Sequence, residues 1–483
     1  MILAIDQSTA ATKAMLCSVN GDLLAREDIT HRQFTNSQGW VEHDCAEILQ
    51  NTYKAAKALI EKSQTAPEAI QAIAISNQRE TAICWDRKSG SALHNAIVWQ
   101  CGRAADITER LRDKLADYVR KSTGLTLSPF FSGAKFAWML ENVPQVAAAM
   151  REGRLCCGTI DSWLIFNLTG NFKTDYSNAS RTQLLNLQSL RWDDTIVQAF
   201  GLHSSCLPEI CMSDSLFGMT DLGGLLPKAV PVHGVLGDSH AALFGNQCWE
   251  AFMAKATYGT GSSVMMNAGA VLPSPVEGVV ASIAWGMDEK VEYVLEGNIN
   301  YTGAVTRWLV EDIGLIESAK DAGSIAQSVA DTGGVYLVPA FTGLGAPYFN
   351  NEARAAFLGM QASTKRAQLV RAAEECIAYQ IRDVVEAIKQ SSKQALSVLR
   401  ADGGPTRDDF LMNFQAGILG IAIEVSQTEE LSGIGAALCA AVGMGLTSRE
   451  NFRPKRRRIE PDMDEARREE LYKGWKKAVQ ILM

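Results

Sequence analysis

The chain has 483 residues, of which 47% are hydrophobic and 21% are charged, as is usual for globular proteins. At roughly 150 residues per domain, this length predicts two to four domains. The formal net charge of -8 argues against a nucleic-acid partner. No apolar run approaches the roughly 20 residues that span a bilayer, and Met1 leads into Ile-Leu-Ala-Ile without a basic stretch. We therefore expect no secretory signal, no membrane partner and a cytoplasmic location.

Motifs for metal clusters are missing from the sequence. The 11 cysteines include no Cys-x-x-Cys pair, and the six histidines form no His-x-x-x-His, which argues against zinc and iron–sulfur sites. Reduced, mostly buried thiols are the simplest interpretation. The basic run 453–458 is followed directly by an acidic stretch, so we interpret it as a solvated, self-compensating face.

The first half of the chain predicts mixed strands and helices. Short apolar runs at 2–5 and 14–17 flank a small polar turn, which predicts a strand, a turn and a strand, and Asn20-Gly21 predicts a second hairpin. Residues 46–62 have helical spacing, and 70–76 are a candidate buried strand. The fold class is therefore α/β.

The second half repeats this theme. A hydroxyl-rich turn at 257–263 leads into an apolar strand at 264–267, as the polar turn near the N-terminus does. Two such turns, about 250 residues apart, suggest two similar domains that face one cleft. Further on, about 25 residues after position 365 are helical, residues 397–404 form a strand that ends in Gly-Gly, and a helix follows from about Asp408.

The first polar turn is a candidate phosphate site. Thr9, Thr12 and Lys13 combine hydroxyls and an ammonium with the backbone N–H groups of a tight turn, which together favour an anion. Asp6, just before the turn, could hold Mg2+ through water molecules. Taken alone, the turn is better explained as a plain polar hairpin.

Two glycine turns add to this interpretation. Gly259-Thr260-Gly261 is neither a Walker loop nor a dinucleotide fingerprint, and it fits better as a second turn against a phosphate. Asp402-Gly403-Gly404 opens a helix and would let a nucleotide approach the backbone. Together the three turns predict a nucleotide held between two domains.

Arg79 and Glu80 are adjacent charges just past the strand at 70–76. An arginine only donates hydrogen bonds and a glutamate only accepts them, and the hydroxyls of a small polyhydroxy compound need both. The alternative is an exposed ion pair of no functional importance.

The chain resembles the glycerol kinases of the FGGY carbohydrate kinase family in long motifs that occur in order from residue 2 to about residue 479: QGWVEHD, SNQRETAICW, NAIVWQCGR, FFSGAKFAWMLEN, TDYSNASRT, GDSHAALFG, TYGTG, VPAFTGLGAPY and DGGPTRDDFLMNFQ. This resemblance implies two actin-like domains of the ribonuclease-H-like type (the ASKHA fold) with a deep cleft between them. We place the N-terminal domain at 1–247 and the C-terminal domain at 248–483. The resemblance also implies ATP and Mg2+ as reactants, a primary hydroxyl as acceptor, and a homodimer or tetramer as compatible assemblies.

The resemblance also implies roles for individual residues. Asp238 falls on the catalytic base, which would orient the attacking hydroxyl and take its proton, and Asp6 and Asp238 fall on the Mg2+ side. The substrate positions are Arg79, Glu80, Trp99, Phe130, Asp238, Ser239 and Ser263, and the nucleotide positions are Thr9, Thr12, Lys13, Thr260, Gly303, Arg307, Gly404 and Asp408. No role is assigned to His240, which we interpret as a packing residue.

Three acceptor-side positions depart from the glycerol kinase pattern. Ser239 replaces Gln, Phe130 replaces Tyr, and Ser263 replaces Phe, so the side chains lose volume and a hydroxyl partner, which leaves more space in the pocket. On the nucleotide side, Lys13 replaces Arg and Asp408 replaces Asn, while a loop associated with sugar-bisphosphate inhibition is missing.

The sequence therefore predicts an ATP-dependent kinase for a polyol or ketose larger than glycerol. The alternatives are a true glycerol kinase and, in another class, a non-catalytic sensor of nucleotide or sugar. A third is an actin- or chaperone-like ATPase that binds no sugar.

Overall fold

The computed structural model describes residues 1–274, 277–392 and 396–483, and its first half is built on one mixed sheet. The six strands lie in the order β14-β15-β6-β1-β2-β3. β6 is parallel to both β1 and β15, whereas the β1–β2, β2–β3 and β14–β15 pairs are antiparallel. The strands are β1 (Ile2–Gln7), β2 (Ala11–Cys17), β3 (Leu23–Thr30), β6 (Ala72–Asn77), β14 (Leu216–Thr220) and β15 (Val230–Gly237).

The second half repeats this topology. Its seven strands lie in the order β18-β19-β17-β16-β22-β23-β24, and β22 is parallel to β16 and β23. The run β19-β17-β16-β22-β23 therefore matches β3-β2-β1-β6-β15 in strand order and direction, which confirms the predicted pair of similar α/β units. The strands are β16 (Ala254–Tyr258), β17 (Ser262–Gly269), β18 (Val280–Met287), β19 (Lys290–Ile299), β22 (Val398–Asp402), β23 (Ala422–Ser426) and β24 (Arg456–Ile459).

β1 lies in the middle of the first sheet and is buried on both faces. Ile2 and Ala4 point into one apolar cluster, and Leu3 and Ile5 point into another, because successive side chains of a strand face opposite ways. Helix α1 (Cys45–Ser63) covers the second face, as the helical spacing at 46–62 predicts, and Asp44 caps its first turn. The sheet is thus covered by helices on both sides.

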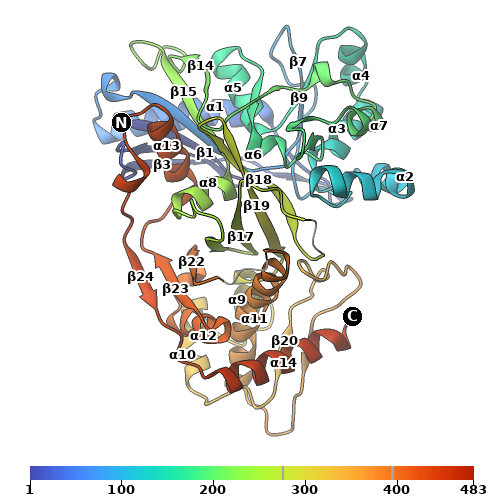
Figure 1. The fold of residues 1–483 in the computed structure, drawn as a ribbon, viewed down its shortest axis with the longest axis vertical. Coiled ribbons are helices and arrows are strands. Elements are labelled where there is room, and N and C mark those ends of the chain that lie inside the picture. The colour runs from blue at the N-terminus through green and yellow to red at the C-terminus, as the bar shows by residue number, and fades with distance from the viewer. Residues whose placement is uncertain (275–276, 393–395) are drawn as a thin grey trace.

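Helix α13 (Leu431–Gly443) comes from the second half of the chain but packs on the first sheet, against β1, β6 and β15 (Figure 1). It also lies against α8 (Asp238–Gly245), where Gly435 faces the carbonyl of Ala241 with no room for a Cβ atom. The predicted boundary at 247/248 falls after α8 and before β16, so α13 returns across it. The division at that residue stays a prediction.

The remaining elements surround these two sheets. The predicted helix after residue 365 is α11, the strand at 397–404 is β22 followed by a glycine turn, and the helix from Asp408 is α12. The other α-helices are α2 (Ala105–Thr123), α3 (Ser132–Asn142), α4 (Pro144–Arg151), α5 (Ile160–Thr169), α6 (Tyr176–Ala179), α7 (Asp194–Ala199), α9 (Gly303–Glu311), α10 (Ala322–Gln327), α11 (Arg366–Ser392), α12 (Asp409–Leu419) and α14 (Glu465–Ile481). Short strands complete the set: β4 (Phe34–Thr35), β5 (Val41–His43), β7 (Ile83–Asp86), β8 (Ala96–Ile97), β9 (Leu155–Gly158), β10 (Lys173–Asp175), β11 (Leu185–Asn186), β12 (Arg191–Trp192), β13 (Glu209–Cys211), β20 (Tyr336–Val338) and β21 (Ala356–Leu358).

All 11 cysteines are buried thiols and none is in a disulfide. Three arginines of the basic run have partners: Arg457 pairs with Asp409, Arg458 pairs with Glu424, and Arg456 donates to Asn246 and Gln247. Across the described ranges, none of the helices has the length and apolarity that a membrane crossing requires.

The contact between α13 and α8 generates a stability prediction. Gly435→Ala places a Cβ against the carbonyl of Ala241, and overpacking of this kind costs about 1–3 kcal/mol. We expect a lower midpoint of denaturant-induced unfolding. Gly102→Ala is the matched control, because a Cβ there meets nothing within 4 Å. Equal midpoints for the two variants would contradict the close packing of the two helices.

Candidate active site

Three parallel strands of the first sheet end side by side. Gln7 at the end of β1 is paired with Asn77 of β6, and Asn77 is paired with Gly237 of β15. The segments that follow carry the predicted residues: the β1–β2 turn, the Gln78–Thr81 turn, and α8, which begins at Asp238. Ligands of α/β proteins bind outside the carboxyl ends of parallel strands, so this edge is the candidate site.

A buried charge network lies at this edge. The carboxylate of Glu296, on β19, is fully buried and accepts hydrogen bonds from both Nη atoms of Arg79, each at 2.9 Å. Nη1 of Arg181 lies 3.1 Å from the same carboxylate, and its Nε donates to Oε1 of Glu80 at 2.5 Å. Arg79 and Glu80 are therefore both buried and bind different partners, so the alternative of an exposed ion pair is wrong.

Electrostatics keep this network charged. Burial alone would raise the pKa of Glu296, but the charges of Arg181 and Arg79 hold it well below its usual range. Burial lowers the pKa of His240 well below its usual range, and the charge of Arg79 lowers it further. His240 is therefore neutral, and its Nε2 lies 3.3 Å from the Ser282 hydroxyl. This buried position supports its interpretation as a packing residue.

Asp238 is the more accessible acid of the site. Its side chain is 36% exposed, and Oδ1 lies 3.1 Å from Nε of Arg79 and accepts the N–H of Ser239 at 2.6 Å. The preceding Gly237 donates its N–H to the Ser177 hydroxyl. Gly237 also leaves room for the Arg79 side chain, because a Cβ at position 237 would lie 2.7 Å from Cγ of that arginine. Asp238 is thus fixed in place while its carboxylate still reaches solvent.

The two serines that depart from the glycerol kinase pattern contact the same ion pair. Nη2 of Arg79 donates to the Ser239 hydroxyl at 3.0 Å, and the Ser263 hydroxyl donates to Oε1 of Glu296 at 3.1 Å. One serine therefore binds the cation of the pair and the other binds the anion. The two serines are smaller than the residues they replace, and their hydroxyls stabilise the charge network.

Aromatic side chains form the wall beside these charges. The rings of Trp99 and Phe130 lie 5.7 Å apart in an edge-on arrangement. Nε1 of Trp99 donates to the Thr9 hydroxyl at 2.9 Å, so the wall is tied directly to the predicted phosphate turn. No local pattern predicts this link between positions 90 residues apart.

The β1–β2 turn places Asp6 and Lys13 together. Lys13 lies 3.8 Å from Asp6 and 2.6 Å from Glu430. Burial raises the pKa of Asp6 to about 6; Lys13 offsets part of this effect, and the negative charges of Asp238 and Glu430 add to it. Asp6 Oδ1 is buried without a hydrogen-bond partner among the described residues, as is the hydroxyl of Thr12.

These acids fit a magnesium ion. The part of the chain that the structure describes contains no cluster of three or more His, Cys, Asp or Glu arranged to hold a metal. Mg2+ does not need one, because it keeps several waters and takes one or two carboxylates together with phosphate oxygens. The unsatisfied oxygen of Asp6 and the accessible carboxylate of Asp238 are suitable donors.

The two predicted glycine turns meet, although they are about 140 residues apart in the sequence. Gly303, at the start of α9, donates its N–H to the Gly259 carbonyl at 2.9 Å, and the Thr260 carbonyl accepts from the same helix. Gly403 has φ 100° and sits against the carbonyl of Tyr258, where only glycine fits. A Cβ at Gly404 would meet open space, so a ligand could approach this backbone.

Two further predicted nucleotide residues, Asp408 and Arg307, have local partners. Asp408 caps α12, where its carboxylate accepts the Leu411 N–H at 3.0 Å. The Arg307 side chain is 59% exposed, and its ion pair is with Glu311 on the same helix. Their roles toward a nucleotide stay predictions.

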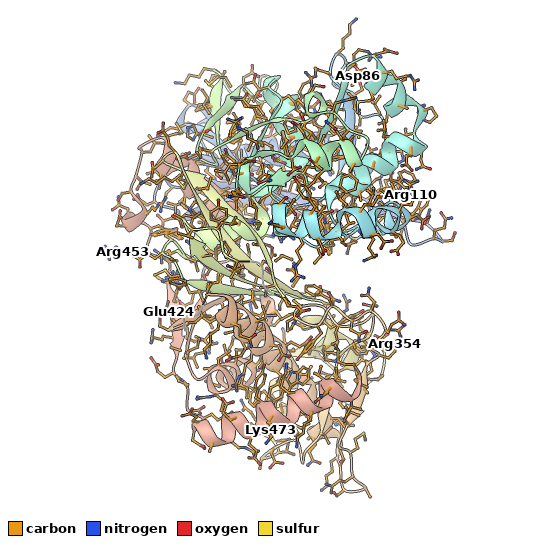
Figure 2. The ribbon with its side chains drawn as sticks, turned by 45° about the vertical axis from the view of Figure 1, so that its right-hand side comes forward. Asp86, Arg110, Arg354, Glu424, Arg453 and Lys473 are labelled. Carbon is orange, nitrogen blue, oxygen red and sulfur yellow. The ribbon has the colours of Figure 1, made fainter. Side chains whose placement is uncertain are left out.

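A cavity of about 680 Å³ lies between the two halves but away from these residues. It is lined by the end of α2, by β18 and β19, and by α11 and α14, and none of the predicted site residues contributes. In Figure 2 the side chains around the labelled Arg110 are separated by a gap from those around the labelled Arg354. The charge network instead joins the halves at the candidate site, through Arg79, Arg181 and Glu296.

Arg181 and Glu296 are site residues that were not predicted from the sequence. Arg181 belongs to the TDYSNASRT motif, which was matched as a whole without a role for this residue. Glu296 is an isolated acid directly after the apolar residues Tyr293–Leu295 of a strand. A carboxylate in such a run needs a buried partner, and this was the available signal.

Comparison with known proteins agrees with the geometry. The family models for the N-terminal and C-terminal domains of the FGGY family of carbohydrate kinases match residues 1–245 and 254–444. "Glycerol kinase 1" of Thermotoga maritima is 46% identical over 492 residues, which cover 100% of this chain and 99% of the relative. The glycerol kinase of Caldanaerobacter subterraneus subsp. tengcongensis is 43% identical, with 100% and 98% covered.

Solved structures give the same result. The glycerol kinase of Plasmodium falciparum, solved with ADP, superposes with a TM-score of 0.94 at 33% identity, and 100% of this chain and 98% of that one are covered. The xylulose kinase of Lactobacillus acidophilus has a TM-score of 0.88 at 21% identity, with 99% and 97% covered, and therefore supports the fold alone.

The fold, the site and these relatives define a kinase that acts on a hydroxyl group. The chain belongs to the FGGY family of carbohydrate kinases and is glycerol-kinase-like. Membership of an enzyme family argues against both the sensor and the sugar-independent ATPase.

Glu374 generates a pH prediction for stability. Burial raises the pKa of this carboxyl to about 8, and the neighbouring charge of Asp408 adds to the rise, while a hydrogen bond from Thr306 opposes it. Between pH 4.5 and 8 the folded state keeps a proton that the unfolded state releases, so folding becomes less favourable as the pH rises. We expect Glu374→Gln to raise the melting temperature above that of the parent by a margin that grows from pH 5 to pH 8. A margin that is constant over this range would contradict the assignment.

Proposed function

We propose that the protein transfers the terminal phosphoryl group of ATP to a primary hydroxyl of glycerol. The observation that carries this proposal is the buried network that presents Asp238, Arg79 and Glu80 beside the aromatic wall. The names of full-length relatives at 42–46% identity support glycerol better than they support a larger polyol.

The acceptor side supplies matched donors and acceptors. Three hydrogen bonds to Glu296 and Ser239 occupy three of the five N–H groups of Arg79, and its Nε lies 3.1 Å from Asp238, which leaves one N–H of Nη1 for a substrate hydroxyl. Arg181 binds Oε1 of Glu80, and the other oxygen, Oε2, takes no hydrogen bond from the described residues. Asp238 would accept the proton of the attacking hydroxyl, and Trp99 would pack against the carbon chain.

The nucleotide side would use the three turns. Thr9, Thr12 and Lys13 would face the phosphates from the first half, and Thr260 would do so from the second. The backbone at Gly303 and Gly404 would lie along the adenosine, with Arg307 and Asp408 near it. Asp6 and Asp238 would hold Mg2+, which neutralises phosphate charge when bound. Lys13 forms ion pairs with both Asp6 and Glu430, so its ammonium could contact a phosphate and still keep one acidic partner.

A larger polyol is the second candidate acceptor. Ser239, Ser263 and Phe130 support it, because these side chains leave space or remove a hydroxyl where the glycerol kinase pattern fills the pocket. The hydrogen bonds of both serines to the Arg79–Glu296 pair weaken the argument, since they show that the two hydroxyls have a structural use.

The assignment of the base predicts the behaviour of Asp238→Asn. The amide keeps the shape of the side chain but cannot take the proton, so we expect kcat to fall by about 10²–10⁴-fold with near-parental acceptor affinity. The measurement is ADP release with glycerol, coupled to a reporter enzyme, with calorimetry for acceptor binding. Undiminished turnover would overturn the role of Asp238 as base.

A panel of acceptors separates the two candidate substrates. We expect the parent to have its highest kcat/KM with glycerol among three-, four- and five-carbon polyols and ketoses. Ser263→Phe refills the pocket, so it should preserve activity toward glycerol and lower activity toward the longer compounds by about 10-fold or more. A parent that prefers a longer acceptor would replace glycerol with the second candidate. ADP release that does not depend on any acceptor would contradict both.

A further inference from the structure

Lys135 is a fully buried lysine directly behind the acceptor residues. It lies in the first turn of α3, and its Nζ donates to the carbonyls of Glu80 at 3.1 Å, of Trp99 at 3.5 Å and of Phe130. Each of these carbonyls belongs to a residue predicted to contact the acceptor, and each lies on a different segment of the chain. One ammonium therefore joins the three segments that form the acceptor pocket.

The contact with Glu80 has a specific effect on the backbone. Glu80 has φ 61°, in the left-handed region that is unfavourable for residues other than glycine. Its carbonyl accepts two hydrogen bonds from α3, one from Lys135 and one from the Ser132 hydroxyl at 3.1 Å. Its carboxylate is held separately by Arg181. The two donors of α3 thus stabilise the backbone conformation that aims Glu80 at the acceptor.

We infer that Lys135 is a positioning residue that sets acceptor affinity by holding the backbone of Glu80, Trp99 and Phe130 in the conformation the substrate needs. This inference rests on the proposed function, since it concerns the polyol site of the kinase. Lys135 does not touch the acceptor itself, because its ammonium lies on the carbonyl side of all three residues.

The protonated form of Lys135 is the one that fits. Three carbonyl oxygens face Nζ, and an ammonium has three N–H groups to give them, whereas a neutral amine turns a lone pair toward one oxygen. Burial lowers the pKa of Lys135 to about 7; the charge of Glu80 and the Cys101 thiol raise it, and Arg103 lowers it. These are the titratable and charged groups that face it. Acceptor affinity should therefore fall as the pH rises through about 7.

The kinetic test uses Lys135→Met in the full-length protein with ATP and glycerol. The methionine keeps the apolar length of the side chain and removes all three donors. We expect the KM for the acceptor to rise by about 10–100-fold, with kcat and the KM for ATP within about twofold of the parent. In the parent, acceptor KM should rise between pH 6 and pH 8.5, and in the variant it should be high and flat.

Met139→Ala is the matched control, because Met139 is buried on the same helix but takes no part in the acceptor site. We expect it to lower the melting temperature as Lys135→Met does, with acceptor KM and its pH profile unchanged. A KM for Lys135→Met within twofold of the parent would overturn the inference. So would a parental pH profile that persists in this variant.

A structural measurement keeps this test separate from that of the proposed function. Failure of the parent to phosphorylate any polyol would reject the proposed function without involving Lys135. In a crystal structure of Lys135→Met, we expect Glu80 to leave positive φ and the Glu80 and Trp99 carbonyls to move apart. An unchanged backbone at both residues would overturn the positioning role, whatever the substrate.

Discussion

The carboxylate of Glu296 is the element on which the rest of the site depends. It is fully buried and lies between two guanidinium groups, Arg79 and Arg181, which come from the other half of the chain. Without it, the two buried guanidinium groups would keep only Glu80 and Asp238 as acidic partners and would lose the carboxylate that lies between them, which is more costly than burying the complete network. Because the arginines are fixed, Glu80 and Asp238, which they contact, are fixed as well. The network of Glu296 and the two arginines therefore joins the two halves and orients Glu80 and Asp238, the predicted site carboxylates, at the same time.

The duplicated sheet explains why the site has two sides. In each half the first strand leads into an antiparallel neighbour through a short turn, and the next parallel strand ends beside it. The turn after β1 thus corresponds to the turn after β16. In the same way, the Gln78–Thr81 turn that carries the predicted acceptor residues Arg79 and Glu80 corresponds to the glycine turn at Gly403. One topology used twice supplies an acceptor side and a nucleotide side in the proposed kinase, with side chains suited to hydroxyls in the first and open backbone in the second.

Local patterns in the sequence were sufficient for much of the fold and part of the site. Apolar runs and turn residues predict the strands around Asp6 and Gly259 because these signals act within a few residues. The partner of Arg79 could not be predicted in this way, because Glu296 is 217 residues away. The same limit applies to Ser239 and Ser263. Their sequence context indicates lost volume, whereas their hydrogen bonds to the ion pair are visible only when distant segments are brought together.

The sequence by itself determined the α/β class, the positions of the three turns, the family resemblance and the candidate base Asp238. These properties follow from hydrophobic spacing, turn chemistry and contiguous motifs, all of which are local along the chain. Only the tertiary structure decided which groups share the buried charges, where helix α13 packs, and that Lys135 contacts the carbonyls of Glu80, Trp99 and Phe130. A buried charge is stable only when oppositely charged or hydrogen-bonding groups surround it in space. The order of residues along the chain does not specify which groups these are.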